Sequence, residues 1–484
     1  MNSHVTEKTP IILVYPNYIE TDPDQIPSLP LGLGYIAQSI VAINETYEIV
    51  DLNIDSTEDL FKLISSEKPK FLAISLMSYK YQISYNLLKT IKTHFPDLII
   101  IAGGPHLTTN LSTVLEECQA IDIGVVGEGE ITIQEIIQGK PLEQIQGVIF
   151  RKRSQIIFTG TREYIQNLDF IPFPLYDKFK LKCYGNAMVL NSSRGCPYHC
   201  IFCGGPKILG NKWRKRSASS MFEELNYWYL KGYRKFLYSD SNFGLDKNRV
   251  IKFCELLAEK TNNIRINADG LRADHFNKEL LEKMWNAGFR SLTFGVESGS
   301  EKVLNRIKKG ESLGKIDDSI KIATEIGFET TLFFIIGSPS EGIEDIEKSF
   351  SLAKKYNIAR VHFFNLTPIP GTEYYDWVVE NNLIPYNLQK YPDEKFGFSD
   401  NALLPNDILT KNQLSLFIKK ARRIERQIYW RYQIQKIFQK LFLGPRACYR
   451  GQFTKISWII SLPIIDSGVR FIIKIGLRCK NCIH

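Results

Sequence analysis

Short apolar runs alternate with helix-length segments along most of this 484-residue chain, and no other feature constrains the fold as strongly. The first five runs occupy residues 11–16, 47–53, 71–78, 98–104 and 121–130. They are nearly continuous in apolar side chains, as in strands that are buried on both faces of a parallel sheet. The segment 81–94 between two of these runs has the pattern of a helix. The order therefore predicts an α/β fold that begins with a doubly wound parallel sheet.

A second series of the same kind follows a hairpin-like stretch at residues 145–160 and a proline-bearing connection at 170–177. Its runs occupy residues 187–193, 235–241, 264–270, 291–298, 330–337 and 360–368. A helix-length segment separates each run from the next, so the pattern indicates six βα units. Because the closed barrel of this type has eight units, we predict a partial (β/α)6 barrel with its functional residues at the carboxyl ends of the strands.

These patterns divide the chain into four parts. We predict a Rossmann-like domain over residues 1–145 and a linker with a β-hairpin over 146–182. The barrel is predicted over 183–400, and a helical extension that is both basic and apolar over 401–484. The basic residues of 419–442 alternate with aromatic and aliphatic ones. Such a helix fits peripheral contact with an anionic membrane surface, and it fits equally well docking on the barrel with its charges in solvent.

The end of the chain carries two further features. Residues 456–479 are more apolar than a surface helix requires, but no stretch is long enough to span a membrane. Cys479, Cys482 and His484 form a C-x2-C-x-H pattern that lacks a fourth metal ligand. We interpret these three residues as part of an exposed terminus.

Composition limits the class of protein. Hydrophobic residues make up 44% of the chain and charged residues 23%, which is typical of a globular enzyme. The net charge of +9 comes mainly from the region after Lys419, and no nucleic-acid-binding motif accompanies it, so we do not expect a nucleic acid as partner. The start of the chain lacks the basic region and cleavage site of a secretory signal, which predicts a cytoplasmic protein.

Three cysteines directly after the first predicted barrel strand indicate a site for a metal or an iron–sulfur cluster. Cys196, Cys200 and Cys203 lie within eight residues, and no fourth cysteine is near. A cubane iron–sulfur cluster has four irons, so three thiolates leave one iron with an exchangeable position. A pure electron carrier needs the fourth thiolate. A structural zinc site needs a closed set of four, which His199 is poorly placed to complete because it is next to Cys200.

The spacing C-x3-C-x2-C after a first barrel strand resembles the signature of the radical S-adenosylmethionine (SAM) superfamily. The resemblance implies that the three cysteines hold a [4Fe-4S] cluster, that SAM binds the open iron, and that its reductive cleavage gives a 5′-deoxyadenosyl radical. Segments 238–244, 294–300 and 333–341 look like further motifs of the family. By this resemblance the SAM-binding residues are Phe202, Asp240, Asn242, Glu297, Ser298, Ile335 and Gly337.

The first domain resembles the cobalamin (B12)-binding domain that precedes the barrel in many radical SAM enzymes. Glycines at the predicted sheet edge would let a corrin lie against the backbone. The residues assigned to cobalamin are Leu31, Gly32, Ser75, Met77, Gly103, Gly104, His106, Gly127, Gly129 and Glu130. No Asp-x-His-x-x-Gly occurs, so the lower ligand of cobalt is left to water or to a nearby side chain, and His106 is interpreted as a loop or phosphate-tail contact.

Together the two resemblances place the chain near the class B radical SAM methylases. They imply transfer of a methyl group from methylcobalamin to an unactivated carbon or a phosphinate phosphorus of a small or lipid-like substrate, with an external electron donor of the flavodoxin or ferredoxin type. A radical SAM oxidoreductase or cyclase on the same scaffold is one alternative. A second alternative is an iron–sulfur electron-transfer or regulatory protein that does not cleave SAM. A third is a membrane adaptor that keeps the barrel as a scaffold.

Overall fold

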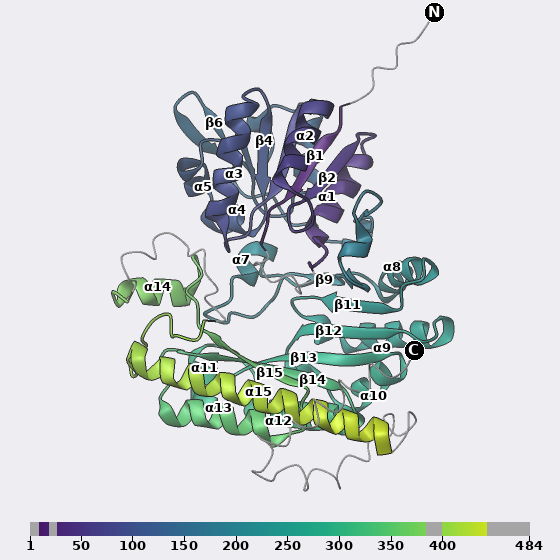
Figure 1. Ribbon diagram of the computed structural model, residues 1–484, viewed down its shortest axis with the longest axis vertical. Coiled ribbons are helices and arrows are strands. Elements are labelled where there is room, and N and C mark those ends of the chain that lie inside the picture. The colour runs from purple at the N-terminus through teal and green to yellow at the C-terminus, as the bar shows by residue number, and fades with distance from the viewer. Residues whose placement is uncertain (1–8, 19–26, 384–398, 443–484) are drawn as a thin grey trace, which may run out of the picture.

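The computed structural model describes residues 9–18, 27–383 and 399–442, with the side chains of 439–442 left out. Two α/β units follow one another along the chain and lie one above the other in Figure 1. One buried apolar cluster runs from the first unit through Tyr176 into the second. The two units therefore share a core, and residues at their junction hold fixed positions relative to one another.

The first unit contains a seven-stranded sheet in the order β2-β1-β3-β4-β5-β6-β7. Its strands are β1 (Ile11–Tyr15), β2 (Tyr47–Asp51), β3 (Phe71–Ser75), β4 (Ile99–Gly103), β5 (Ile123–Val125), β6 (Val148–Lys152) and β7 (Gln155–Phe158). The first five are parallel, and each lies within one of the apolar runs seen in the sequence. This confirms the doubly wound sheet.

The hairpin at residues 145–160 belongs to this sheet and not to a linker. β6 pairs antiparallel with β5, and β7 pairs antiparallel with β6. The predicted boundary at residue 145 therefore falls inside one continuous sheet. The sequence showed the hairpin, but apolar Ile149 and Phe150 gave no sign of which sheet edge they would cover.

Helices cover both faces of the first sheet. They are α1 (Leu31–Val41), α2 (Thr57–Glu67), α3 (Tyr81–His94), α4 (Pro105–Asn110), α5 (Ser112–Glu117) and α6 (Glu130–Ile137). Apolar side chains of α1 and α6 join the cluster that continues into the second unit, whereas those of α2 to α5 form a separate cluster on the other face. The helix predicted at residues 81–94 has the same bounds in the structure.

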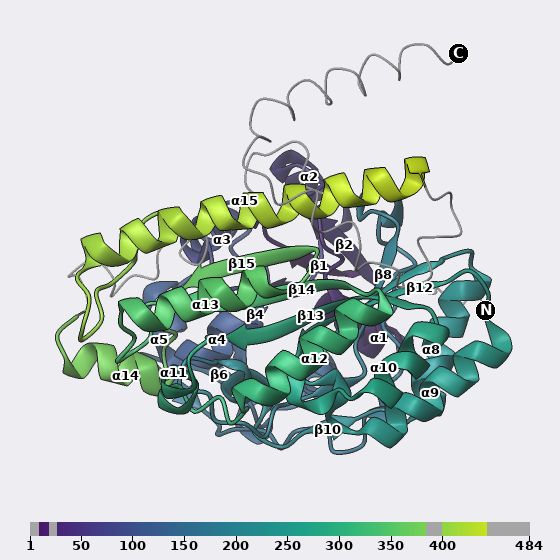
Figure 2. The same cartoon turned by 90° about the horizontal axis from the view of Figure 1, so that it is seen from below.

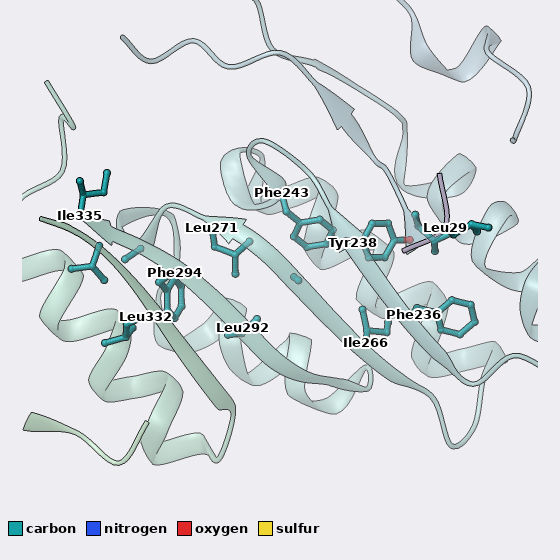
Figure 3. Close-up of a cluster of buried hydrophobic side chains, with 14 of the residues drawn as sticks. Leu29, Phe236, Tyr238, Phe243, Ile266, Leu271, Leu292, Phe294, Leu332 and Ile335 are labelled. Atoms are coloured by element: carbon teal, nitrogen blue, oxygen red, sulfur yellow. The ribbon is translucent and has the colours of Figure 1, made fainter. Parts of the chain in front are cut away.

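The second unit contains six parallel strands in chain order, β15-β14-β13-β12-β11-β8. These strands are β8 (Ala187–Leu190), β11 (Lys235–Ser239), β12 (Arg265–Leu271), β13 (Phe289–Glu297), β14 (Glu329–Ile336) and β15 (Arg360–Asn365). The two edge strands, β8 and β15, do not pair with each other, so the barrel is open. Figure 3 shows side chains such as Phe236, Leu292 and Phe294 along these strands, where they form the core.

The barrel helices lie outside the sheet. They are α8 (Ala218–Leu230), α9 (Lys247–Lys260), α10 (Lys278–Asn286), α11 (Glu301–Arg306), α12 (Leu313–Ile326), α13 (Ile343–Lys355) and α14 (Glu373–Glu380). The short strand β9 (Ser193–Arg194) and α7 (Gly205–Leu209) lie between the two units (Figure 1). The strand β10 (Arg214–Lys215) pairs antiparallel with β9. Short 3-10 helices occur at Leu142–Gln144, Leu168–Phe170, Leu181–Cys183, Phe243–Leu245 and Ala273–His275.

The basic segment of the extension forms α15 (Lys411–Phe442), which docks on the barrel along β15 and α13 (Figure 2). Its buried face carries Leu414, Ile418, Ala421, Ile424 and Ile428. Glu425 Oε1 accepts a hydrogen bond of 2.7 Å from Phe363 N, which covers the outer edge of β15. The docking interpretation thus accounts for the apolar face of this helix.

No helix in the described part of the chain is long and apolar enough to cross a membrane. The apolar stretch at 456–479, and with it Cys479, Cys482 and His484, lies outside the described residues.

Candidate active site

The three cysteines lie in the loop between β9 and α7, above the carboxyl end of the first barrel strand. Cys203 is exposed, Cys196 and Cys200 are half-buried, and none of the three is in a disulfide. Backbone hydrogen bonds hold the loop: Cys196 N donates to Gly210 O at 3.1 Å, and Cys203 N donates to Cys200 O at 3.1 Å. Burial raises the pKa of the Cys200 thiol to about 11.

The local backbone requires glycine immediately before the first cysteine. Gly195 has φ +84°, and a Cβ added there would lie 2.2 Å from Lys212 O. Any other residue would push the segment 209–212, which precedes β10, away from the cysteine loop. The Arg-Gly-Cys order thus lets the chain turn sharply from β9 into the cysteine loop.

The donor set suits a cluster better than a single ion. In the part of the chain that the structure describes, no three His, Cys, Asp or Glu side chains gather closely enough to hold one metal ion. In a cubane each thiolate binds a different iron, so its ligands stand farther apart than those of a mononuclear site. Three accessible thiols on one short loop fit this requirement.

Two predicted SAM contacts follow β11, and they differ in what they touch. Asn242 is buried, and its Nδ2 lies 3.7 Å from Cys196 Sγ, so it does border the cysteine loop. Asp240 instead accepts hydrogen bonds from Ser192 N at 2.6 Å and from Ser193 Oγ at 3.1 Å. Both of its oxygens accept hydrogen bonds, so Asp240 fixes the strand end before the cysteines, and its contact with SAM stays a prediction. Burial raises the pKa of this carboxyl, while Arg249 and the serines oppose that shift.

The end of β13 carries a buried charge network. Glu297 has φ +65°, which is uncommon for a residue other than glycine. Its Oε1 lies 3.0 Å from Lys309 Nζ, which also lies 3.5 Å from Glu311 Oε1. Burial alone would lower the pKa of Lys309, but the two carboxylates raise it above its usual value, so the amine stays charged.

Ser298, the next residue, points away from the charge network of Glu297, Lys309 and Glu311. Its side chain is fully buried, its Oγ accepts from Ser300 N at 3.2 Å, and it lies 3.5 Å from Ser349 Oγ of α13. The Ser298 hydroxyl thus faces α13, and its assistance in ribose binding stays a prediction. The sequence could not show this, since side-chain direction changes at the end of a strand.

The end of β14 is shaped by a buried carboxyl. Gly337 has φ +99°, and Glu341 Oε2 accepts hydrogen bonds from Gly337 N at 2.7 Å and from Ser338 N at 3.2 Å. Burial raises the pKa of Glu341 to about 8. The side chain thus closes the turn after Ile335, whose backbone was predicted to flank adenine. Phe202 is half-buried beside the same core.

A cavity of about 340 Å³ opens at the junction of the two units. Eight of the ten residues predicted to bind cobalamin line it: Leu31, Gly32, Ser75, Gly103, Gly104, Gly127, Gly129 and Glu130. The barrel side contributes Asn191, Arg194, Ile208 and Leu209. The cavity therefore lies between the carboxyl edge of the first sheet and α7, which begins two residues after Cys203.

The glycines at this edge leave backbone exposed for a large flat ligand. Gly32 has no atom within 4 Å of where a Cβ would stand, so the space beside it is open. Gly104 has φ +97°, and a Cβ there would lie 2.8 Å from Leu76 O. A close approach of a corrin to the chain fits such a surface.

Met77 and His106, the other two residues predicted to bind cobalamin, do not line the cavity. Met77 N donates to Tyr18 OH at 2.9 Å. His106 is buried on the other face of the sheet, with its Nε2 3.0 Å from Tyr85 OH and its ring stacked on Tyr81. Burial lowers the pKa of His106 to about 4, so it is a neutral core residue. Its place after Gly-Gly-Pro suggested an edge position, but the helix start turns the ring inward.

A buried ion cluster at the edge of the cavity was not anticipated. Glu128 lies 3.0 Å from Arg194 Nη1 and 2.8 Å from Arg214 Nη1, and Arg194 Nη2 lies 2.7 Å from Glu130 Oε1. The acids come from the first unit and the arginines from the β9–β10 ladder. The only signal in the sequence was the Gly-Glu-Gly-Glu pattern, in which two acids alternate with glycines. A solvent-exposed loop would not need those glycines.

Comparisons with known proteins agree with this geometry. The family model of the radical SAM superfamily matches residues 190–353, and that of the B12 binding domain matches residues 27–137. An uncharacterized methyltransferase of Pyrococcus horikoshii is 31% identical over 404 residues, which cover 81% of this chain and 86% of that protein. The chain is a B12-binding radical SAM enzyme. Its cofactors are a [4Fe-4S] cluster, SAM and cobalamin, as the sequence predicts.

Two further comparisons are with a cyclase and with a solved structure. The anaerobic magnesium-protoporphyrin IX monomethyl ester cyclase of Synechocystis is 26% identical, over 76% of this chain and 76% of that protein. The solved structure of the radical SAM methyltransferase TsrM from Kitasatospora setae, with tryptophan and a SAM analog bound, has a TM-score of 0.68. It is 18% identical and covers 77% of this chain and 76% of that one, so it confirms the fold.

Proposed function

We propose that this B12-binding radical SAM enzyme transfers a methyl group to an unactivated carbon, or to a phosphinate phosphorus, of a small or lipid-like substrate. When bound, the cluster and SAM supply a 5′-deoxyadenosyl radical for hydrogen abstraction, and cobalamin carries the methyl group. One observation carries the proposal: the cavity lined by the sheet-edge glycines is also lined by Ile208 and Leu209 of α7, directly after the cysteine loop.

The chain's own residues position the reacting groups and keep water out. Apolar side chains such as Leu31 and Ile133 dominate the cavity wall. The ion cluster of Glu128, Arg194 and Arg214 locks the wall of the first unit to the barrel. A site held this way keeps two cofactors and a substrate at fixed separations, which is the main contribution that a protein makes to cofactor chemistry.

The electrons for SAM cleavage are proposed to come from an external donor of the flavodoxin or ferredoxin type. Cys203 is exposed, so one corner of a cluster on this loop is accessible to such a partner. The buried cysteines of the described residues, Cys118 and Cys254, lie in apolar cores and offer no second redox centre.

Product analysis after anaerobic reconstitution with iron, sulfide and hydroxocobalamin tests the proposal. Reduced protein with SAM should form both 5′-deoxyadenosine and S-adenosylhomocysteine, the second from methylation of cobalamin. Deoxyadenosine without S-adenosylhomocysteine, and without bound corrinoid, would remove methyl transfer and favour the oxidoreductase or cyclase reading that the Synechocystis relative suggests. Absence of both products would favour an electron-transfer or regulatory role.

We also propose a cytoplasmic location with peripheral contact to anionic membranes through the outer face of α15. This face carries Lys419, Arg423 and Arg426, followed by Trp430 and Ile437, whose side chains are 44% and 49% exposed. Cations with exposed apolar side chains are typical of helices that lie on anionic bilayers. Sedimentation with phosphatidylcholine vesicles, with and without phosphatidylglycerol, tests this. Arg423→Glu with Arg426→Glu should abolish binding, and unchanged binding would refute it.

A further inference from the structure

The segment between the first two cysteines is held by one side chain, that of Tyr198. Its neighbours Pro197 and His199 are exposed. The Tyr198 ring lies under the guanidinium of Arg272, with 3.5 Å from Cζ to the ring centroid, and its hydroxyl lies 2.8 Å from His275 Nε2. Tyr198 therefore anchors the middle of the loop to the end of β12 in two ways.

Arg272 is itself fixed in a buried position. It follows β12 directly and is 5% exposed. Its Nη1 donates to Lys309 O at 2.6 Å, its Nη2 donates to Gly310 O at 3.1 Å, and its Nε lies 3.4 Å from Glu311 Oε1. A guanidinium held on several sides keeps its plane fixed, which an ammonium group on a flexible stem cannot do. Tyr198 thus rests on a rigid flat support.

The same turn also fixes Glu297. The backbone carbonyl of Lys309 accepts a hydrogen bond from Arg272 Nη1, and its ammonium group lies 3.0 Å from Glu297 Oε1. Glu311 lies within 3.5 Å of both the Lys309 and the Arg272 side chains. A continuous set of contacts therefore connects the cysteine loop with the carboxylate at the end of β13.

We propose that Arg272 is a positioning residue that fixes the segment between Cys196 and Cys200 through Tyr198 and keeps it in register with Glu297. The cysteines and Glu297 then belong to one rigid frame, although they are about a hundred residues apart in the sequence. Residues that orient ligands typically change metal affinity by roughly 10- to 100-fold when they are replaced. The inference rests on the cluster assignment and not on the identity of the methylated substrate.

Iron retention tests the anchor. Each variant is reconstituted anaerobically with iron and sulfide, and the rate of iron loss to EDTA is measured. Tyr198→Leu removes both contacts and should lose iron roughly 10- to 100-fold faster than the parent. Tyr198→Phe keeps the ring under Arg272, so its rate of iron loss should lie between those of the parent and of Tyr198→Leu. His199→Leu changes the exposed neighbour in the same loop and should match the parent.

Electron paramagnetic resonance of the reduced cluster tests the link to Glu297. SAM should change the spectrum of the parent and of the His199→Leu protein, and the change should be altered or lost in Arg272→Lys. Parental iron retention in Tyr198→Leu, or a parental response to SAM in Arg272→Lys, would overturn the inference. If Arg272→Lys has a lowered Tm, iron retention in the variants of half-buried Tyr198 still tests the inference. Neither readout depends on methyl transfer, so a failure of the proposed methylation would leave both intact.

Discussion

Filling the open space beside Gly32 offers a clean test of the cavity as the cobalamin site. Gly32 is the second residue of α1, lines the cavity, and has no atom within 4 Å of a built Cβ. Leucine at this position should therefore fit the free protein without strain. Because glycine is a poor helix former, Gly32→Leu should stabilise the fold by about 0.5–1 kcal/mol. Gly104 would not serve, since a Cβ there meets Leu76 O at 2.8 Å.

The leucine side chain should compete with the corrin for the same space. Forcing extra methylenes into a well-packed contact costs about 1–3 kcal/mol, which corresponds to roughly 5- to 150-fold weaker binding. The assay is corrinoid absorbance retained after reconstitution with hydroxocobalamin and gel filtration, with iron content and Tm recorded on the same samples. Gly32→Leu should lose corrinoid, keep its iron and show a Tm equal to or slightly above that of the parent.

Gly314 provides a matched control. It is the second residue of α12, is exposed, and has nothing within 4 Å of a built Cβ, but it lies away from the cavity. Gly314→Leu should show the same small gain in stability with parental corrinoid content. Parental corrinoid in Gly32→Leu, or equal loss in both variants, would refute the placement of cobalamin in this cavity.

Two further predictions concern groups that the sequence misplaced or missed. Burial lowers the pKa of His106 to about 4, against about 6.5 in the unfolded chain. As the pH falls, the unfolded chain therefore binds the proton first. Folding stability on the order of 3 kcal/mol should be lost between about pH 6.5 and pH 4. His106→Gln should flatten this part of a denaturation series, whereas a parental slope would contradict the assignment; exposed His94→Gln should keep the slope. Glu128→Gln leaves Arg214 without its buried carboxylate and should lower the free energy of unfolding in urea by about 3–5 kcal/mol. Glu143→Gln, in an exposed pair, should leave it nearly unchanged. Equal costs would show that the Glu128 cluster does not stabilise the domain junction.

The sequence predicts most of the fold because strand burial leaves a direct trace in the pattern of residues. Buried parallel strands require continuous apolar runs, and all six runs of the second series became strands of the open barrel. The glycines at the sheet edge are also visible in the sequence, but for different reasons. Gly104 has φ +97° and a Cβ there would lie 2.8 Å from Leu76 O, so the turn itself requires glycine, whereas Gly32 borders open space in the cavity.

Side-chain direction is what the sequence could not provide. Asp240 follows its strand as a ligand-binding acid would, yet the nearby backbone amide of Ser192 engages it. His106 follows a glycine turn at the sheet edge, yet its ring stacks inside the core. Contacts between distant segments, such as Arg272 on Tyr198, depend on the complete tertiary structure and have no local signature.

Mössbauer spectroscopy of the ⁵⁷Fe-reconstituted protein, with and without SAM, tests the central claim most directly. With Cys196, Cys200 and Cys203 as the thiolate ligands, one iron of the cubane should differ from the other three, and its signal should shift when SAM is added. A cubane with four equivalent sulfur-ligated irons that SAM leaves unchanged, or no cubane at all, would contradict the account.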